Sequence, residues 1–424
     1  MRAFAACLVA ACVLITAPAA AAYPVTPRSA PVFLDSVGVV THAVYYDTAY
    51  GNWPKVVARL RELGVRHVRD GVYANPTPAW RDWNERYYRA IELAAAHGIR
   101  FTFGMGNPGS ETGTVDQLVA VVAGRLRSAV EALEAPNEFD KYGGGRRWRS
   151  RLSAYGRELY RKVKAHPSLR SLPVLGPSFA TVRAPKLFGD QRSWMDVGNV
   201  HPYTGGLSPD PKHLRTELQR ARAVSGGKPV WATEVGFHNA MRATSGQPPV
   251  SEDAAAVYLL RTFLEHFRSG IRRTYAYELV DEKPERAKRD PEQHFGLLRH
   301  DMTRKPAFRA LKNLLRLVGG DGRPRLRPIR LDVAGRGADV RRLVLQKADG
   351  TYLVALWRLA SAWDRERRRP LRVRPRPVTV TVPGAARVEL SDPAVSPSAR
   401  RLRLRHGRVQ LRLAERPLVL SVTP

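Results

Sequence analysis

The sequence predicts a (β/α)8 TIM barrel followed by a small antiparallel β-sandwich domain. Eight short β-rich runs lie between residues 37 and 278, and amphipathic helical stretches separate most of them. No Gly-x-Gly-x-x-Gly follows the first run, so nothing supports dinucleotide binding, and an open doubly wound sheet is the alternative fold. Beyond residues 319–322, which read Gly-Gly-Asp-Gly, the helical period disappears. We therefore expect the barrel at residues 23–318 and the sandwich at residues 323–424.

The predicted barrel strands are short runs that are rich in β-branched and aromatic residues, taken in chain order. They are Val37–Ala43, Val65–Arg69, Arg100–Gly104, Ala132–Ala135, Pro173–Gly176, Val197–Val200, Pro229–Thr233 and Arg273–Glu278. In a barrel of this kind the carboxyl ends of the strands form the active-site face, so polar residues at those ends are the first candidates for chemistry.

The predicted helices follow start and stop signals in the sequence. A helix begins at Trp53-Pro54 and ends at Gly64, and a second runs from Trp80 to His97. Further helical patterns cover Val115–Val130, Trp148–Ala165, His213–Ala223, Glu252–Arg268 and Pro306–Leu317. Only a short helix, near Pro185–Phe188, fits between the fifth and sixth strands.

The C-terminal part reads as strands separated by Gly, Pro and Asp turns. The expected strands are Arg342–Gln346, Tyr352–Trp357, Val378–Val382, Arg408–Leu413 and Leu418–Val422. Residues 23–34 are expected to add a strand to this sandwich.

The N-terminal 22 residues have the pattern of a secretory signal peptide. Met1-Arg2 is followed by an apolar stretch and then by a run of small residues before Tyr23. The only two cysteines, Cys7 and Cys12, lie in this segment, so the mature chain has no disulfide, thiolate metal site or cysteine nucleophile. Because Val9-Ala10-Ala11-Cys12 also resembles a lipoprotein cleavage box, lipid anchoring is the alternative to free secretion. No later run reaches the ~18 apolar residues that a membrane span needs.

The chain is strongly basic, with 70 Lys and Arg against 38 Asp and Glu and a formal net charge of +32. Of the basic residues 58 are Arg, which is the bias that GC-rich coding gives, so the charge is explained either by composition or by an anionic partner. Residues 321–424 hold 24 basic and 9 acidic side chains. Without zinc-finger spacing or an RNA-binding aromatic signature, an acidic or cell-envelope glycan is a better candidate partner than nucleic acid.

Two glutamates follow predicted strands at positions that suit a shared reaction. The fourth strand is followed by Asn137-Glu138, and the seventh is followed by Glu234. Strands four and seven lie across a barrel from one another, so both carboxylates can face one substrate. Cleavage of a glycosidic bond needs such a pair, one carboxyl as acid and the other as nucleophile or base. The charge of one carboxylate is expected to raise the pKa of the other.

With these motifs the chain resembles clan A glycoside hydrolases and is similar to families 5 and 39 over residues 35–315. The resemblance implies that Glu138 is the acid/base, that Asn137 binds the sugar 2-hydroxyl, and that Glu234 is the nucleophile. His201-Pro202-Tyr203 matches a His-x-Tyr after strand six, whose tyrosine hydrogen-bonds the nucleophile in the clan. The Arg at the end of strand two, which often does the same, corresponds to Arg69, for which an ion pair with Asp70 is the structural alternative.

The sequence departs from the clan after strand eight, where a Trp platform under the sugar is common. This chain has Tyr277-Glu278 there, so Tyr277 is the candidate platform and Glu278 a candidate polar contact. His42, after the first strand, is a further candidate for sugar recognition. The 11 histidines show no metal-binding spacing, and nothing calls for an organic cofactor.

The sequence thus predicts a secreted retaining glycoside hydrolase that acts on a polysaccharide or oligosaccharide. A catalytically inactive glycan-binding or envelope-adhesion protein on the same scaffold is the alternative. A transglycosylase, which shares the chemistry up to the acceptor, is a further one.

Overall fold

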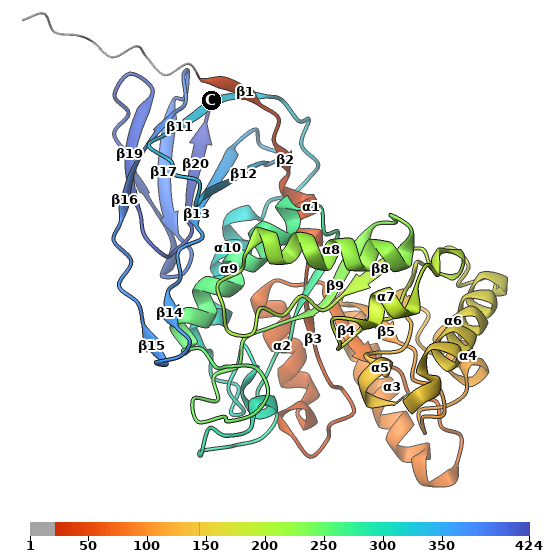
Figure 1. Cartoon of the computed structure of the whole chain (residues 1–424). Helices are drawn as coiled ribbons and strands as arrows, with labels where there is room; N and C mark the ends of the chain where they lie inside the picture. The colour runs from red at the N-terminus through yellow and green to blue at the C-terminus, as the bar shows by residue number, and fades with distance from the viewer. Residues whose placement is uncertain (1–21, 144) are drawn as a thin grey trace, which may run out of the picture.

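The computed structural model describes residues 22–143 and 145–424, which form a barrel and a β-sandwich side by side (Figure 1). The predicted signal peptide falls on residues 1–22 and so lies outside the described residues, apart from Ala22. Across the described ranges, no helix has both the length and the apolar character that a bilayer span requires. The predicted fold class, a TIM barrel followed by a β-sandwich, is confirmed.

The barrel is one parallel sheet of eight strands in the order β7-β6-β5-β4-β3-β10-β9-β8. A parallel bridge between Leu175 and Val197 joins the two ends of this order, which closes the barrel. The strands are β3 (Val37–Val40), β4 (His67–Gly71), β5 (Arg100–Gly104), β6 (Val130–Glu134), β7 (Val174–Leu175), β8 (Gly198–Val200), β9 (Val230–Val235) and β10 (Thr274–Ala276).

Helices surround the barrel and follow most of its strands (Figure 1). They are α1 (Ala30–Asp35), α2 (Trp53–Leu63), α3 (Arg81–Ala96), α4 (Val115–Ala123), α5 (Phe139–Tyr142), α6 (Trp148–Ala165), α7 (Ala184–Phe188), α8 (Pro211–Ser225), α9 (Glu252–Arg268) and α10 (Pro306–Val318). Short 3-10 turns occur at η1 (Ala49–Gly51), η2 (Pro78–Trp80), η3 (Gly145–Arg147), η4 (Arg192–Trp194) and η5 (Pro291–His294).

Local signals explain where these helices begin and end. The side chain of Asn52 caps α2 at Lys55 N, and Gly64 ends the helix in the left-handed conformation, with φ 86°. A capping box between Thr114 and Gln117 starts α4. That helix ends at Ala123 rather than near Val130, because Val130 already belongs to the buried strand β6.

The C-terminal part is a sandwich of two sheets with a small hairpin, and their strands pair antiparallel except for β2 with β12. The first sheet has the order β1-β11-β16-β19 and the second β18-β17-β20-β13-β12-β2. Its elements are β1 (Tyr23–Val25), β2 (Arg28–Ser29), β11 (Ile329–Ala334), β12 (Val340–Gln346), β13 (Tyr352–Arg358), β16 (Arg376–Thr381), β17 (Arg387–Asp392), β18 (Ser396–Arg401), β19 (Arg408–Leu413) and β20 (Leu418–Thr423), with the hairpin β14 (Trp363–Asp364) and β15 (Arg369–Pro370).

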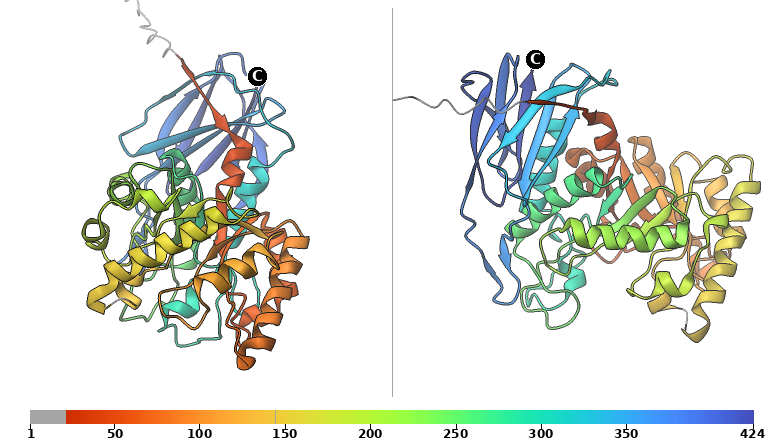
Figure 2. Two further views of the ribbon diagram at one scale, coloured as in Figure 1. Left: turned by 90° about the vertical axis from the view of Figure 1, so that its right-hand side faces the viewer. Right: turned by 45° about the horizontal axis from the view of Figure 1, so that its top comes forward.

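The N-terminal strands belong to the sandwich even though the barrel follows them in sequence. β1 pairs antiparallel with β11, and β2 pairs parallel with β12. Figure 2 shows this segment running along the sandwich before it enters the barrel. The sandwich is therefore built from both ends of the described chain.

The large sheet of the sandwich packs on both of its faces. One face meets the smaller sheet in a core that includes Val354, Leu356 and Val380. Leu353 and Trp357 on the other face pack into a core that also contains buried side chains of the helices around the barrel. Helices α9 and α10 lie between the barrel and the sandwich (Figure 1). The two parts thus share one continuous apolar core.

Candidate active site

Glu138 lies just past the carboxyl end of β6, in the turn that leads into α5. Its backbone adopts φ 43° and ψ 36°, a left-handed conformation that residues other than glycine rarely enter. Its N–H donates to Ser178 Oγ at 3.3 Å, and its side chain lines the cavity at the barrel mouth with 15% of its surface exposed. Strain of this kind, ~1–3 kcal/mol, clusters at functional sites.

Glu234 lies near the end of β9 and is held by hydrogen bonds at both oxygens. Arg69 Nη1 donates to Oε1 at 2.6 Å, and the Tyr203 hydroxyl donates to Oε2 at 3.0 Å. Its side chain is 11% exposed. The carboxylate is therefore fixed in orientation.

His201, which follows β8, stands between the two glutamates. Its Nδ1 lies 2.8 Å from Glu138 Oε1 and 3.6 Å from Glu234 Oε2. One oxygen of each glutamate and a ring nitrogen of His201 all lie within 4.8 Å of one another. The fold thus places Glu138 and Glu234 close together in the lining of one cavity.

Hydrogen bonding decides where the protons of His201 lie. Its Nε2 is 2.9 Å from Thr233 Oγ1, which is also 2.8 Å from Asn199 Oδ1 and 3.0 Å from Glu134 Oε1. Since those last two atoms only accept, the single hydroxyl proton of Thr233 goes to one of them, and Nε2 must donate to Thr233. On the other side of the ring, Nδ1 and Glu138 share one proton between them.

The pKa shifts of this pair have opposite directions. Burial raises the pKa of Glu138, but the hydrogen bond with His201 and the charges of His201 and Arg69 outweigh it, so the pKa is lowered overall. Burial lowers the pKa of His201, but the charge of Glu234 and the bond to Glu138 raise it above the ordinary value. The expectation of a raised pKa for the acid is wrong because His201, rather than the second carboxylate, is the nearest partner of Glu138.

Glu134 organises the floor of the site, and sequence reasoning missed it. Its fully buried carboxylate accepts from Arg69 Nε at 2.6 Å, Arg69 Nη2 at 3.0 Å and Asn199 Nδ2 at 2.9 Å. This two-pronged bond orients the guanidinium toward Glu234. The available signal was a carboxylate that follows Ala132 and Leu133 at the end of a predicted buried strand, where an unpaired charge is too costly to bury.

The alternative explanation of Arg69, an ion pair with Asp70, is wrong. Asp70 instead accepts hydrogen bonds from Thr41 Oγ1 at 2.6 Å and from the backbone N–H groups of Ala43 and Gly71 at 2.9 and 2.8 Å. Burial raises the pKa of Asp70 to about 7. Arg69 and Asp70 are neighbours on one strand, so their side chains point in different directions.

Asn137 is fixed through its amide oxygen. Oδ1 accepts from Arg69 Nη2 at 2.7 Å and from Ser178 Oγ at 3.0 Å. The residue also lines the cavity, so its amide nitrogen is the part that can serve a ligand.

Tyr277 and His42 form a neighbouring part of the cavity wall. The Tyr277 hydroxyl donates to Glu292 Oε2 at 3.1 Å, and its ring meets that of His42 edge to face, with centroids 5.8 Å apart. Burial lowers the pKa of His42 to about 4, so its imidazole is neutral at neutral pH. The pattern of the sequence gave no indication of Glu292, which also lines the cavity.

The cavity at the barrel mouth has a volume of about 1030 Å³. All eight residues predicted from the sequence line it: Glu138, Glu234, Asn137, His201, Tyr203, Arg69, His42 and Tyr277. Acidic residues outnumber basic ones in its charged lining, with Asp70, Glu138, Glu217, Glu234 and Glu292 against Arg69, Lys141 and Arg220. A cavity of this size and polarity fits one or more sugar units.

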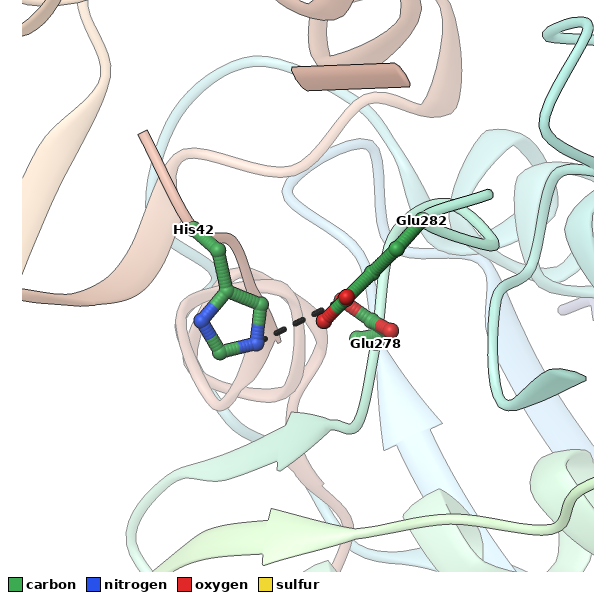
Figure 3. A group of neighbouring side chains, drawn as sticks. All are labelled: His42, Glu278 and Glu282. Atoms are coloured by element: carbon green, nitrogen blue, oxygen red, sulfur yellow. Dashed lines mark ion pairs between the residues drawn. The ribbon is translucent and has the colours of Figure 1, made fainter. Parts of the chain in front are cut away.

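Within residues 22–143 and 145–424, two groups of side chains could hold a metal ion, although no spacing in the sequence revealed them. One is Glu138, His201 and Glu234, and the other is His42, Glu278 and Glu282 (Figure 3). Each group unites residues from different strand ends, which only the folded chain brings together.

Comparison with known proteins shows a likeness of fold alone. No family model and no curated sequence matches the chain. A monomeric β-xylosidase from Caulobacter crescentus CB15 aligns with a TM-score of 0.60 and 16% identity, covering 95% of this chain and 98% of that protein. A glucosidase from Croceicoccus marinus aligns with a TM-score of 0.57 and 13% identity, covering 87% and 92%. The chain therefore has the barrel-and-sandwich fold that its resemblance to clan A glycoside hydrolases implied.

Proposed function

We propose that the protein is a retaining glycoside hydrolase with Glu138 as acid/base and Glu234 as nucleophile. The observation that carries this proposal is the placement of two carboxylates in one cavity, with an oxygen of each within 4.8 Å of the other. Retaining enzymes have carboxyl groups ~5–5.5 Å apart, whereas inverting enzymes need ~6.5–9.5 Å to admit a water molecule. Two oxygens less than 4.8 Å apart leave too little room for a water molecule between the carboxylates, which favours retention.

In the first step a Glu234 oxygen attacks the anomeric carbon while the bond from that carbon to the leaving oxygen breaks. The leaving oxygen takes the proton that Glu138 and His201 share. In the second step Glu138 takes a proton from water as the water oxygen bonds to the anomeric carbon, and the bond from that carbon to the Glu234 oxygen breaks, which returns Glu234 as a carboxylate. Arg69 and Tyr203 keep Glu234 aligned for the attack.

Two of the proteins that share the fold over most of their length are named as a β-xylosidase and a glucosidase. Both names denote cleavage of glycosidic bonds, which supports the same reaction class for this chain. Their identities of 16% and 13% carry no sugar specificity across.

The substitution Glu234→Gln tests the proposal. We expect it to abolish turnover of every glycan and aryl glycoside that the native protein cleaves, because an amide does not form the glycosyl ester. A fluorosugar that traps the intermediate should label Glu234 in the native protein, as located by peptide mass spectrometry. Glu158→Gln, which changes a half-exposed carboxyl group of α6 outside the cavity lining, is the control and should retain activity.

An inactive glycan-binding or adhesion protein is the competing proposal. It gains support if a broad glycan panel gives sugar binding but no turnover and no fluorosugar label. A Glu234→Gln variant that keeps the activity of the native protein contradicts the assignment of Glu234 as the nucleophile.

We further propose that an anionic or cell-envelope glycan contacts the sandwich rather than the reacting centre. The cavity is mainly acidic, whereas Arg400, Arg401 and Arg412 are exposed on β18 and β19 and form no ion pair within the described residues. Retention on an immobilised anionic polysaccharide should fall as salt rises through the range in which surface charges are screened. Retention that does not depend on salt contradicts this role. Secretion through the predicted signal peptide is part of the same proposal.

A further inference from the structure

A second cluster of chemically capable side chains lies beside the cavity, at the carboxyl ends of β3 and β10. His42 follows β3, and Glu278 and Glu282 follow β10, which pairs with β3 in the barrel. Figure 3 shows the imidazole and the two carboxylates pointing toward one another. The proposed glycosidase mechanism uses neither glutamate.

The three side chains direct ligand atoms at a common point. His42 Nε2 lies 3.4 Å from Glu278 Oε2, and one ligand atom from each residue lies within 4.8 Å of the others. Two ligands ~2.1 Å from one zinc ion at a tetrahedral angle are ~3.4 Å apart. The histidine–glutamate pair thus already has the separation of two zinc ligands.

The cluster leaves buried polar atoms without partners. Glu278 is fully buried, and within the described ranges its Oε1 has no hydrogen-bond partner. His42 Nε2 is also buried and lacks a hydrogen bond there. No Lys or Arg in the described part of the chain forms an ion pair with Glu278 or Glu282. Burying an ionised carboxylate such as that of Glu278 without a partner is costly, and a bound cation would remove that cost.

Neighbouring tyrosine side chains hold Glu278 and His42 in fixed orientations, as residues behind the ligands of a metal site do. The Tyr50 hydroxyl donates to Glu278 Oε2 at 2.7 Å, which orients that carboxylate. The ring of Tyr45 stacks on His42 with centroids 4.6 Å apart, and Tyr277 meets its edge. The imidazole is therefore held in one orientation before any ligand arrives.

We propose that His42, Glu278 and Glu282 bind a divalent transition-metal ion of the zinc class. An imidazole nitrogen with two carboxylates suits zinc, whereas calcium and magnesium prefer oxygen ligands alone. An amino sugar, which also carries positive charge, does not fit, because neither glutamate lines the cavity. Glu282 is partly exposed and provides a route for the ion from solvent.

The ion would also define the role of His42 toward the cavity. Metal binding at Nε2 places the remaining ring proton on Nδ1. Figure 3 shows Nδ1 on the side of the ring opposite the glutamates, and His42 lines the cavity. His42 Nδ1–H would then always be available as a hydrogen-bond donor to a ligand in the cavity. Without a metal ion, the neutral imidazole carries its proton on Nδ1 in only one of its two tautomers.

Metal titration of the full chain after chelator treatment tests this site without any substrate. Isothermal titration with Zn²⁺ should show one tight site per chain, and bound Co²⁺ should give visible absorption bands of low coordination number. Glu282→Gln should weaken Zn²⁺ binding at least ~10-fold, since even lost outer contacts cost metal sites ~10–100-fold. Glu285→Gln, on the same loop, is the matched control and should bind like the native protein.

A further variant separates this site from the catalytic group, which also contains a histidine and two glutamates. Glu138→Gln should leave the tight site intact if the ion binds at His42. Loss of binding in Glu138→Gln with retention in Glu282→Gln overturns the assignment, as does absence of tight binding of Zn²⁺ and Co²⁺ in the native chain. Circular dichroism of each variant establishes that it is folded.

Discussion

At the scale of single residues, the contact between His201 and Glu138 sets the acid chemistry. The two side chains share one proton across 2.8 Å, and the other ring nitrogen is committed to Thr233. The pair as a whole, rather than Glu138 alone, therefore supplies the proton, and its titration belongs to both groups. The pKa of His201 is raised and that of Glu138 is lowered, so the shared proton leaves as the pH rises through the raised value of His201.

This arrangement predicts a change in the pH profile when His201 is replaced. In the native protein kcat/KM should fall on the alkaline side with a midpoint above pH ~6.5, which is the ordinary pKa of histidine. In His201→Asn, Glu138 holds its proton unaided, so the limb should move to lower pH. The measurement is kcat/KM for an aryl glycoside as a function of pH.

Tyr203→Phe is the control for this profile. It removes the hydrogen bond to Glu234 but leaves the His201–Glu138 contact, so kcat should fall while the alkaline limb stays in place. An alkaline limb that does not move in His201→Asn shows that another group holds the catalytic proton.

At the scale of elements, the strand ends decide which side chains meet. Thr233 and Glu234 are consecutive, and in an ideal strand consecutive side chains point to opposite faces. Here Thr233 bonds to Glu134 inside the barrel while Glu234 enters the cavity beside it. The pairing of β9 with β10 is irregular at this level, which permits both placements.

Gly236, just past the end of β9, is a position with almost no room for a side chain. A Cβ atom there would lie 2.2 Å from the backbone oxygen of Tyr277. Because backbone cannot rotate away, Gly236→Ala should lower the free energy of unfolding by ~1–3 kcal/mol, the usual cost of overpacking. It should also reduce activity, since the displaced residue is a cavity residue. Chemical denaturation measures the first effect and steady-state kinetics the second.

Gly104 provides the matched control at another strand end. A Cβ atom there would meet its nearest neighbours only at 3.8 and 4.0 Å. Gly104→Ala should therefore change the free energy of unfolding by less than ~0.5 kcal/mol. Equal stability of the two variants contradicts the steric argument for Gly236.

At the scale of the whole molecule, the sandwich and the barrel stabilise one another. Arg261 of α9 is fully buried and donates to the backbone oxygen of Ala360 at 2.7 Å and to that of Glu415. Trp363 of the hairpin donates to Pro249 O at 3.0 Å, and so supports the loop that borders the cavity at Gln247. The sandwich therefore supports the cavity wall as well as the helices.

Trp357 tests this mutual dependence. Its side chain is fully buried in the core that the sandwich shares with the barrel helices. Trp357→Ala should lower the free energy of unfolding by ~3–5 kcal/mol through loss of buried area and the cavity it leaves. Denaturant unfolding followed by circular dichroism measures the loss.

Trp83→Ala is the comparison, because that ring is 37% exposed and lies far from the sandwich in sequence. Trp83→Ala should lower the free energy of unfolding much less than Trp357→Ala does. If Trp357→Ala unfolds the sandwich at a lower denaturant concentration while the barrel transition stays unchanged, the two parts are independent, contrary to the shared core described above.

The sequence by itself determined the order of elements. Periodicity, together with caps such as Asn52 and Gly64, is local information, and it placed eight strands and most helices close to their observed bounds. The ordinal positions of Asn137-Glu138 and Glu234 then predicted which residues would face the cavity. Both follow from the fact that parallel strands deliver their carboxyl ends to one face of a barrel.

Only the tertiary structure decided which groups touch. The contact of Arg69 with the buried Glu134, the placement of His201 beside Glu138, and the cluster of His42 with Glu278 and Glu282 all join segments far apart in the chain. Such contacts depend on side-chain directions at irregular strand ends and on burial, neither of which a linear pattern contains. For the same reason the direction of the Glu138 pKa shift could not be predicted, because it depends on which charge lies nearest after folding.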